Sequence, residues 1–135
     1  MKARAVIIHE LAHARAALAA AAELGVAVEL WSAPGAAAYA GAGWFDAVMR
    51  AAGNQAPAAV FTGVLDCDDR ADLAQAALRQ GLTHVCFRGA QAVAVRLADI
   101  ARQYGATLHR RRPRALDLIY TDDPLAACRG WLAAD

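Results

Sequence analysis

Cysteine, lysine and long apolar runs are all scarce in this chain of 135 residues. The three cysteines, Cys67, Cys86 and Cys128, are an odd number with no C-x-x-C pair, which favours free thiols in a reducing cytoplasm over a disulfide framework. No apolar run reaches the roughly 18 residues that a membrane span needs. The N-terminal apolar run is interrupted at His9 and Glu10, so it makes a poor signal peptide. We therefore expect a soluble, cytoplasmic protein that has no membrane partner.

The chain also has almost no net charge. The 14 basic and 13 acidic residues leave a formal net charge of +1, which gives no general reason to expect a nucleic-acid partner. The hydrophobic fraction of 59%, much of it alanine, is typical of a globular, helix-rich chain. At this length we expect a single domain over residues 1–135. An apolar face at Trp44, Phe45, Val48 and Met49 is either plain core or an interface, and we expect a homo-oligomer.

Short apolar runs alternate with helical stretches along the whole chain. The expected strands are 5–8, 26–31, 58–65, 83–87, 106–109 and 115–120, and the expected helices are 10–23, 44–52, 68–80, 90–104 and one that opens at Pro124. Asp68 or Asp69 is expected as one N-cap and Asp122 or Asp123 as another. Gly25 and Gly53 are expected to end the first two helices, and the segment 32–43 is expected as a loop. This pattern predicts a small doubly wound, flavodoxin/Rossmann-like α/β domain, with a mainly parallel sheet of about five strands and helices on both faces.

The string His9-Glu10-Leu11-Ala12-His13 resembles the HExxH signature of zinc metalloproteases, in which two helical histidines bind zinc and the glutamate activates a water. The resemblance implies a zinc hydrolase built on His9, Glu10 and His13. The wider sequence argues against it, because no residue downstream is well placed as a third ligand and only one short strand precedes the motif. We therefore predict no metal or other cofactor, and we expect His9 to lie at the carboxyl end of the first strand, where α/β proteins bind ligands.

Polar residues follow the next three predicted strands. Ser32 and Gly35 come after the second strand, Asp66 and Asp68 after the third, and Arg88 after the fourth. The carboxyl ends of parallel strands share one edge of a sheet, so we expect these side chains near a common ligand site. A small anion is the expected ligand, because a glycine-rich loop and an arginine suit phosphate or carboxylate groups.

Three further features near these strands each have a functional and a structural interpretation. The string from Asp66 to Arg70 resembles the first motif of haloacid-dehalogenase-type phosphatases, which implies a nucleophilic carboxylate, but Arg70 departs from that motif. Helix capping by Asp68 or Asp69 explains most of the string. Cys67 is expected as a buried, inert thiol. The basic turn 109–114 could hold a phosphate, yet a solvated loop is favoured.

The region 64–89 resembles βα units of phosphate-binding barrels and flavodoxin-like proteins in pattern only, which implies no activity. The leading hypothesis is an oligomeric binding or regulatory module for a small anionic ligand. The alternative is a small enzyme that uses the same cleft with Asp66 or His9 as acid/base. Whether the chain is an enzyme stays open at this point.

Overall fold

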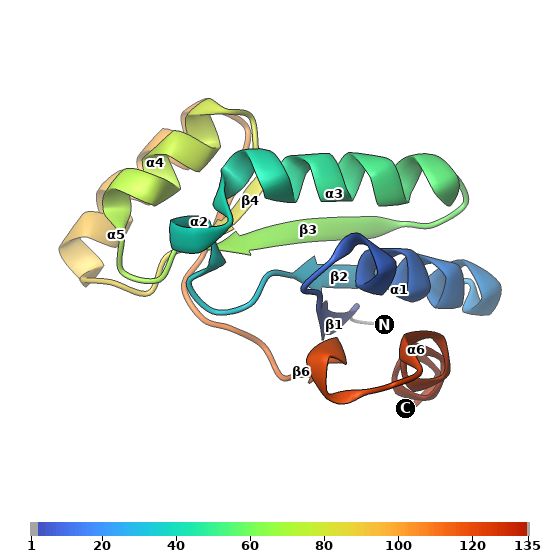
Figure 1. The fold of residues 1–135 in the computed structure, drawn as a ribbon. Helices are drawn as coiled ribbons and strands as arrows, with labels where there is room; N and C mark the ends of the chain where they lie inside the picture. The colour runs from blue at the N-terminus through green and yellow to red at the C-terminus, as the bar shows by residue number, and fades with distance from the viewer. Residues whose placement is uncertain (1–2, 135) are drawn as a thin grey trace. The chain divides into compact units, whose positions relative to one another are not determined.

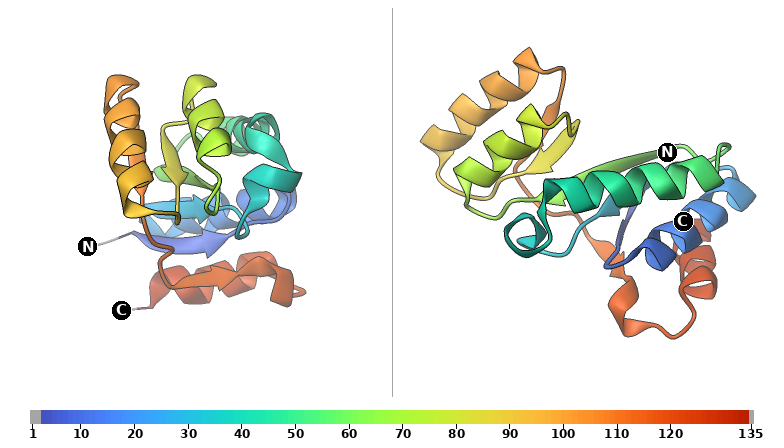
Figure 2. Two further views of the ribbon diagram at one scale, coloured as in Figure 1. Left: turned by 90° about the vertical axis from the view of Figure 1, so that its left-hand side faces the viewer. Right: turned by 45° about the horizontal axis from the view of Figure 1, so that its top comes forward.

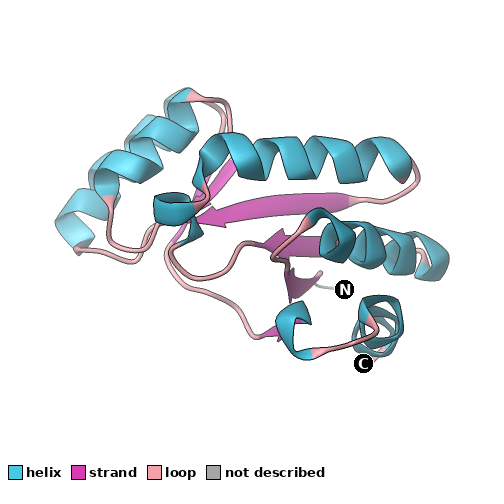
Figure 3. Cartoon of the chain, in the orientation of Figure 1, coloured by secondary structure: helices cyan, strands magenta, loops and turns pink. Residues whose placement is uncertain are grey.

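The computed structural model of the chain describes residues 3–134. Its strands are β1 (Arg4–Ile7), β2 (Val28–Trp31), β3 (Phe61–Asp66), β4 (His84–Cys86), β5 (Thr107–His109) and β6 (Ala115–Asp117). Its helices are α1 (Leu11–Leu24), α2 (Ala36–Tyr39), α3 (Gly41–Gln55), α4 (Ala71–Arg79), α5 (Gln91–Gln103), α6 (Pro124–Ala133) and the short 3-10 helix η1 (Leu118–Tyr120) (Figures 1 and 3).

The strands form an all-parallel sheet in the order β5-β4-β3-β2-β1-β6, with helices on both sides. The predicted α/β fold class is therefore confirmed. The sheet has six strands among the described residues rather than about five, because both short C-terminal runs pair into it. Within these residues no helix combines the length and the apolar character that a membrane crossing requires.

The described residues divide into two compact units. Unit 1 takes in 3–31, 47–62 and 114–134, and unit 2 takes in 32–46 and 63–113. Helix α3 and strand β3 contribute residues to both units. Whether the chain behaves as the single predicted domain stays a prediction.

Unit 1 is built around β1, which lies between β2 and β6. Ile7 of β1 is in parallel register with Trp31 of β2 on one side and with Asp117 of β6 on the other. Helix α1 packs against α6 (Figure 2). The buried face of α1 consists of Ala14, Ala17, Leu18, Ala20 and Ala21, and small side chains let two helices approach closely.

Two glycines of unit 1 have different roles. Gly25 ends α1 as predicted, with φ at 65° and its N–H directed to the carbonyls of the last helical turn, a conformation that glycine adopts without steric cost. Gly53 was expected just past a helix, and this expectation is wrong, because α3 continues to Gln55. A β-carbon at Gly53 would lie 3.1 Å from Cζ of Phe61. The position therefore serves packing against the Phe61 ring.

Unit 2 contains β4 between β3 and β5. Val85 of β4 pairs with Leu65 of β3 and with Leu108 of β5, and all three strands run in parallel. Helices α4 and α5 pack against each other. The segment 32–43 is not the loop that was expected, because it contains α2 and the start of α3. The largest fully buried side chains of this unit are Phe45, Phe87, Leu65, Leu78 and Val64.

The helix starts agree only in part with the predicted N-caps. Asp123 caps α6 as expected, and its carboxylate accepts a hydrogen bond from the N–H of Ala126 at 3.1 Å. The prediction that Asp68 or Asp69 caps the helix expected over 68–80 is wrong, because α4 begins at Ala71 and Arg70 stands at its N-cap without a side-chain bond. Asp68 has a left-handed φ of 54°, so its backbone cannot have the extended conformation that an N-cap needs.

Candidate functional site

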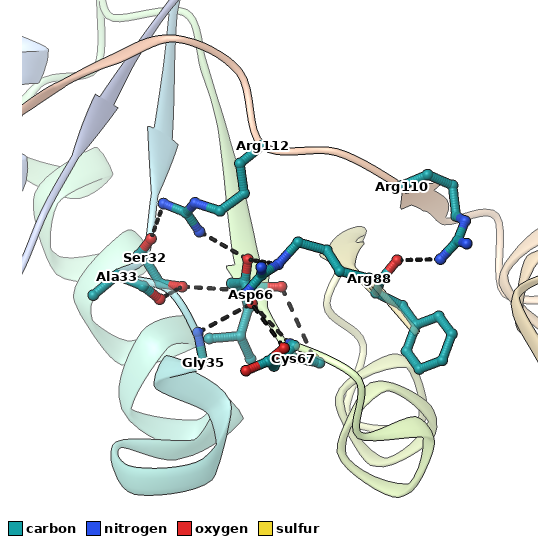
Figure 4. Close-up of polar contacts among 11 residues, drawn as sticks. Ser32, Ala33, Gly35, Asp66, Cys67, Arg88, Arg110 and Arg112 are labelled. Atoms are coloured by element: carbon teal, nitrogen blue, oxygen red, sulfur yellow. Dashed lines mark hydrogen bonds and ion pairs between the residues drawn. The ribbon is translucent and has the colours of Figure 1, made fainter. Parts of the chain in front are cut away.

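Asp66, the last residue of β3, is the organising residue of unit 2. Its side chain is completely buried, although aspartate is almost never buried unless it is paired. Oδ1 accepts the backbone N–H of Gly35 at 3.0 Å and that of Asp68 at 2.7 Å. Oδ2 accepts Nη1 of Arg112 at 2.9 Å and Nε of Arg88 at 3.1 Å. Figure 4 shows both guanidinium groups directed at this carboxylate.

The local backbone explains why two N–H groups point at Asp66. Gly35 and Asp68 both have left-handed conformations, with φ at 70° and 54°, which turn their N–H groups away from ordinary helix or strand partners. Glycine adopts this conformation freely, and aspartate tolerates it better than most residues. The N–H of Asp66 itself is bound by Oγ of Ser32 at 2.9 Å, and Ser32 is fully buried. Together with Arg88 and Arg112, these residues bring the loops after β2, β3, β4 and β5 to one carboxyl group.

The two arginines differ in how deeply they lie. Nη2 of Arg112 also donates to the carbonyl of Ser32 at 2.8 Å, and 16% of the Arg112 side chain is exposed. Arg88 is 32% exposed, and its Nη2 lies 3.5 Å from Oδ1 of Asp68, whose own side chain is 55% exposed. The group thus combines two positive and two negative charges, with Arg88 and Asp68 on its solvent side.

The pKa of Asp66 reflects two opposing influences. Burial alone raises the pKa of a carboxyl group, but the hydrogen bonds from Arg112, Gly35, Arg88 and Asp68 together outweigh it, and the pKa of Asp66 lies below its ordinary value. The carboxylate is ionised at neutral pH, and two oxygens offer about four acceptor sites. All of these sites are taken, so Asp66 is suited to positioning its partners rather than to transferring protons.

The basic turn after β5 is not the solvated loop that was favoured. Besides Arg112, it contributes Arg110, whose Nη2 donates to the carbonyl of Gly89 at 2.9 Å. The Arg110 guanidinium also lies over the ring of Phe87, 5.5 Å from its centroid, a cation–π arrangement. A side chain at Gly89 would overlap that ring. Arg110 therefore holds the loop from β4 to α5, the loop that carries Arg88.

The three cysteines are free and buried, as expected. Burial raises the pKa of the Cys67 thiol to about 12, and the Asp66 charge adds to the effect. Burial likewise raises the pKa of Cys86 to about 12 and that of Cys128 to about 11. A thiol with such a pKa stays protonated at neutral pH and is a poor nucleophile.

The metalloprotease-like string lies in unit 1 and does not have the geometry of a helical zinc motif. His9 precedes α1, Glu10 stands at the N-cap with an extended φ of −156°, and only His13 is helical. Nδ1 of His13 accepts the backbone N–H of His9 at 3.0 Å, and Nε2 of His9 contacts Asp117 at 2.6 Å. Over residues 3–134 no group of three or more potential ligands is placed to hold a metal ion.

The structure brings together all five residues that the sequence singled out: Ser32, Gly35, Asp66, Asp68 and Arg88. Sequence reasoning missed Arg112 as a member of this group. The signal was present in the arginine-rich turn, but nothing in the local pattern shows that one of these arginines reaches a buried carboxylate. The chain matches none of the protein-family models with which it was compared, and no curated protein matches it significantly.

Proposed function

We propose that this chain binds a small anion carrying a phosphate or carboxylate group, at the guanidinium groups of Arg88 and Arg112. The observation that carries the proposal is that one buried carboxylate, Asp66, orients both arginines. Guanidinium groups bind carboxylate and phosphate oxygens through paired hydrogen bonds. Each arginine also keeps part of its side chain exposed, so an anion from solution has a surface to bind.

Preorganisation supports this role. A free arginine side chain loses much conformational freedom when it binds a ligand, and a side chain already held by its protein loses less. Arg88 is held by Asp66 through two of its nitrogens. The anion therefore meets a donor that is already in place.

Charge balance assigns a distinct role to Asp68. The two arginines carry two positive charges, and the buried Asp66 neutralises one of them. The exposed Asp68 carboxylate lies 3.5 Å from Nη2 of Arg88 and pairs with the remaining positive charge. A bound anion replaces Asp68 at Arg88, so Asp68 acts as an internal competitor that lowers the affinity.

A binding or regulatory module fits this site better than an enzyme does. The Asp66 carboxylate has no acceptor site left for a substrate proton, and the neighbouring thiols of Cys67 and Cys86 are protonated. The alternative function, a small enzyme with Asp66 or His9 as acid/base, therefore depends on His9, which lies in unit 1.

We propose a homo-oligomer, since apolar side chains such as Val95 and Tyr104 at α5 are exposed at 59% and 54%. Light scattering coupled to size exclusion measures the oligomer. A net charge of +1 supports no nucleic-acid partner, and buried free thiols fit a cytoplasmic location.

Titration calorimetry with inorganic phosphate tests the anion site. Arg88→Gln should weaken binding about tenfold or more, because a hydrogen bond to a charged group contributes about 1.5–3 kcal/mol. Asp68→Asn should strengthen binding several-fold, because it removes the competing charge while asparagine keeps the left-handed backbone. Arg111→Gln is the matched control, since it removes one exposed positive charge from the same basic turn. If wild type binds no phosphate at millimolar concentration, or if Arg88→Gln binds as well as wild type, the proposal is wrong.

A further inference from the structure

His9 and Asp117 meet at the carboxyl ends of two neighbouring strands of unit 1. β1 ends at Ile7 and β6 ends at Asp117, and these two residues are in register. From β1 the chain goes on to β2 on one side, whereas β6 lies on the other side of β1. Strand order thus reverses at β1. In open α/β sheets ligands bind outside the carboxyl ends of the strands at such a point of reversal.

The contact between the two side chains is short. Nε2 of His9 lies 2.6 Å from Oδ1 of Asp117, and the side chains are 22% and 25% exposed. Oδ1 of Asp117 also accepts the N–H of Ile119 at 3.1 Å and so begins η1. An ionised carboxylate can only accept, so the hydrogen of the neutral imidazole is on Nε2. Nδ1 of His9 then carries the basic lone pair.

His13 holds the backbone of His9 in place. Its Nδ1 accepts the His9 N–H at 3.0 Å, and the two rings meet edge to face with centroids 5.8 Å apart. Burial lowers the pKa of His13, and the opposing influence of Glu10 does not cancel this effect. A neutral His13 keeps its lone pair for the His9 N–H. The acceptor bond therefore persists at neutral pH and restricts the position of His9.

We infer that His9 is a general base for the hydrolysis of small uncharged esters, with Asp117 and His13 as positioning residues. Nδ1 takes a proton from water while the water oxygen forms a bond to the carbonyl carbon. The C–O bond to the alcohol then breaks, and the proton on Nδ1 passes to the departing alcohol oxygen. Asp117 stabilises the imidazolium in between. Anionic substrates are disfavoured, because Asp117 places negative charge beside the base. The inference is independent of the anion site, which lies in unit 2.

Hydrolysis of p-nitrophenyl acetate by the full chain at neutral pH tests the inference. His9→Gln and Asp117→Asn should each lower kcat/KM at least about tenfold, since a positioned base contributes about 10²–10⁴. Glu10→Gln is the matched control: it removes one negative charge beside the histidines, and Glu10 makes no side-chain capping bond. Its kcat/KM should stay near that of wild type. Thermal unfolding of each variant verifies that it is folded.

Nitrogen NMR of the imidazoles supplies a second readout that does not depend on activity. In wild type the neutral His9 ring should carry its hydrogen on Nε2, and Asp117→Asn should produce a mixture of tautomers. Equal hydrolysis by wild type and His9→Gln would overturn the inference, as would a wild-type ring with its hydrogen on Nδ1. If Asp117→Asn and Glu10→Gln lowered kcat/KM equally, Asp117 would act only through its negative charge, and its positioning role would be overturned.

Discussion

Nη1 of Arg112 lies 2.9 Å from Oδ2 of Asp66, a residue 46 positions earlier in the chain. The same guanidinium donates to the carbonyl of Ser32, 80 positions earlier. One side chain thus joins the loop after β2, the end of β3 and the turn after β5 within unit 2.

Asp66→Asn should destabilise the protein by about 3 kcal/mol, because it leaves two arginines without their buried counter-charge. This magnitude is at the lower end for a broken buried pair, since both arginines keep some solvent contact. Urea unfolding at pH 7 measures it. Asp69→Asn is the control, because Asp69 is exposed, and its change should stay within about 0.5 kcal/mol. Equal stability of the two variants would contradict the assigned role of Asp66.

The stability difference between wild type and Asp66→Asn should also depend on pH. The folded-state pKa of Asp66 is lowered, so ionised Asp66 stabilises the fold above its unfolded-state pKa of about 4. This contribution is lost as the pH falls below that value towards the folded-state pKa. Urea unfolding at pH 7, 5, 4 and 3 should show a difference that is constant down to about pH 5 and then shrinks. A difference that is unchanged at pH 3 would mean that Asp66 contributes without its charge.

Gly89→Ala should destabilise the protein by about 1–3 kcal/mol, because the new methyl group overlaps the buried Phe87 ring and overpacking has costs of this size. Gly130→Ala in α6 is the matched control. Nothing lies within 4 Å of a β-carbon at Gly130, so this substitution should stabilise the helix by up to about 1 kcal/mol. Chemical denaturation of both variants measures the change in the free energy of unfolding, which should be negative for Gly89→Ala and positive for Gly130→Ala. If Gly89→Ala left the stability unchanged, the Phe87 ring would have to move aside at little cost.

The three thiols should be unreactive in the folded protein. Burial raises the pKa of Cys67, Cys86 and Cys128 to about 12, about 12 and about 11, so almost no thiolate is present at pH 8. A colorimetric disulfide reagent at pH 8 should therefore label none of them within minutes in buffer, and all three in denaturant. Rapid labelling of one thiol in buffer would show that its surroundings open readily.

Much of the fold could be predicted because it depends on local patterns. The helix that ends at Gly25 and the helix that starts at Asp123 were both found from capping residues. The expectations that failed concern helix ends whose exact positions the local pattern does not show. Gly53 lies within α3, and a β-carbon at this position would crowd the Phe61 ring. Asp68 does not cap α4, because its backbone is left-handed and the helix begins only at Ala71.

The candidate site, too, was predictable in part from local patterns. The order of residues along the chain suffices to predict that parallel strands are followed by Ser32, Gly35, Asp66, Asp68 and Arg88, and parallel strands bring their carboxyl ends to one edge. The pairing of individual atoms depends instead on how the chain packs in three dimensions. From the sequence, the Asp66 carboxylate could be a base, a helix cap or a counter-ion. In the structure it is the counter-ion, because Arg112 and the backbone N–H groups of Gly35 and Asp68 bind its oxygens. A buried charge is tolerated only where such partners converge, and no local pattern encodes partners that lie so far along the chain.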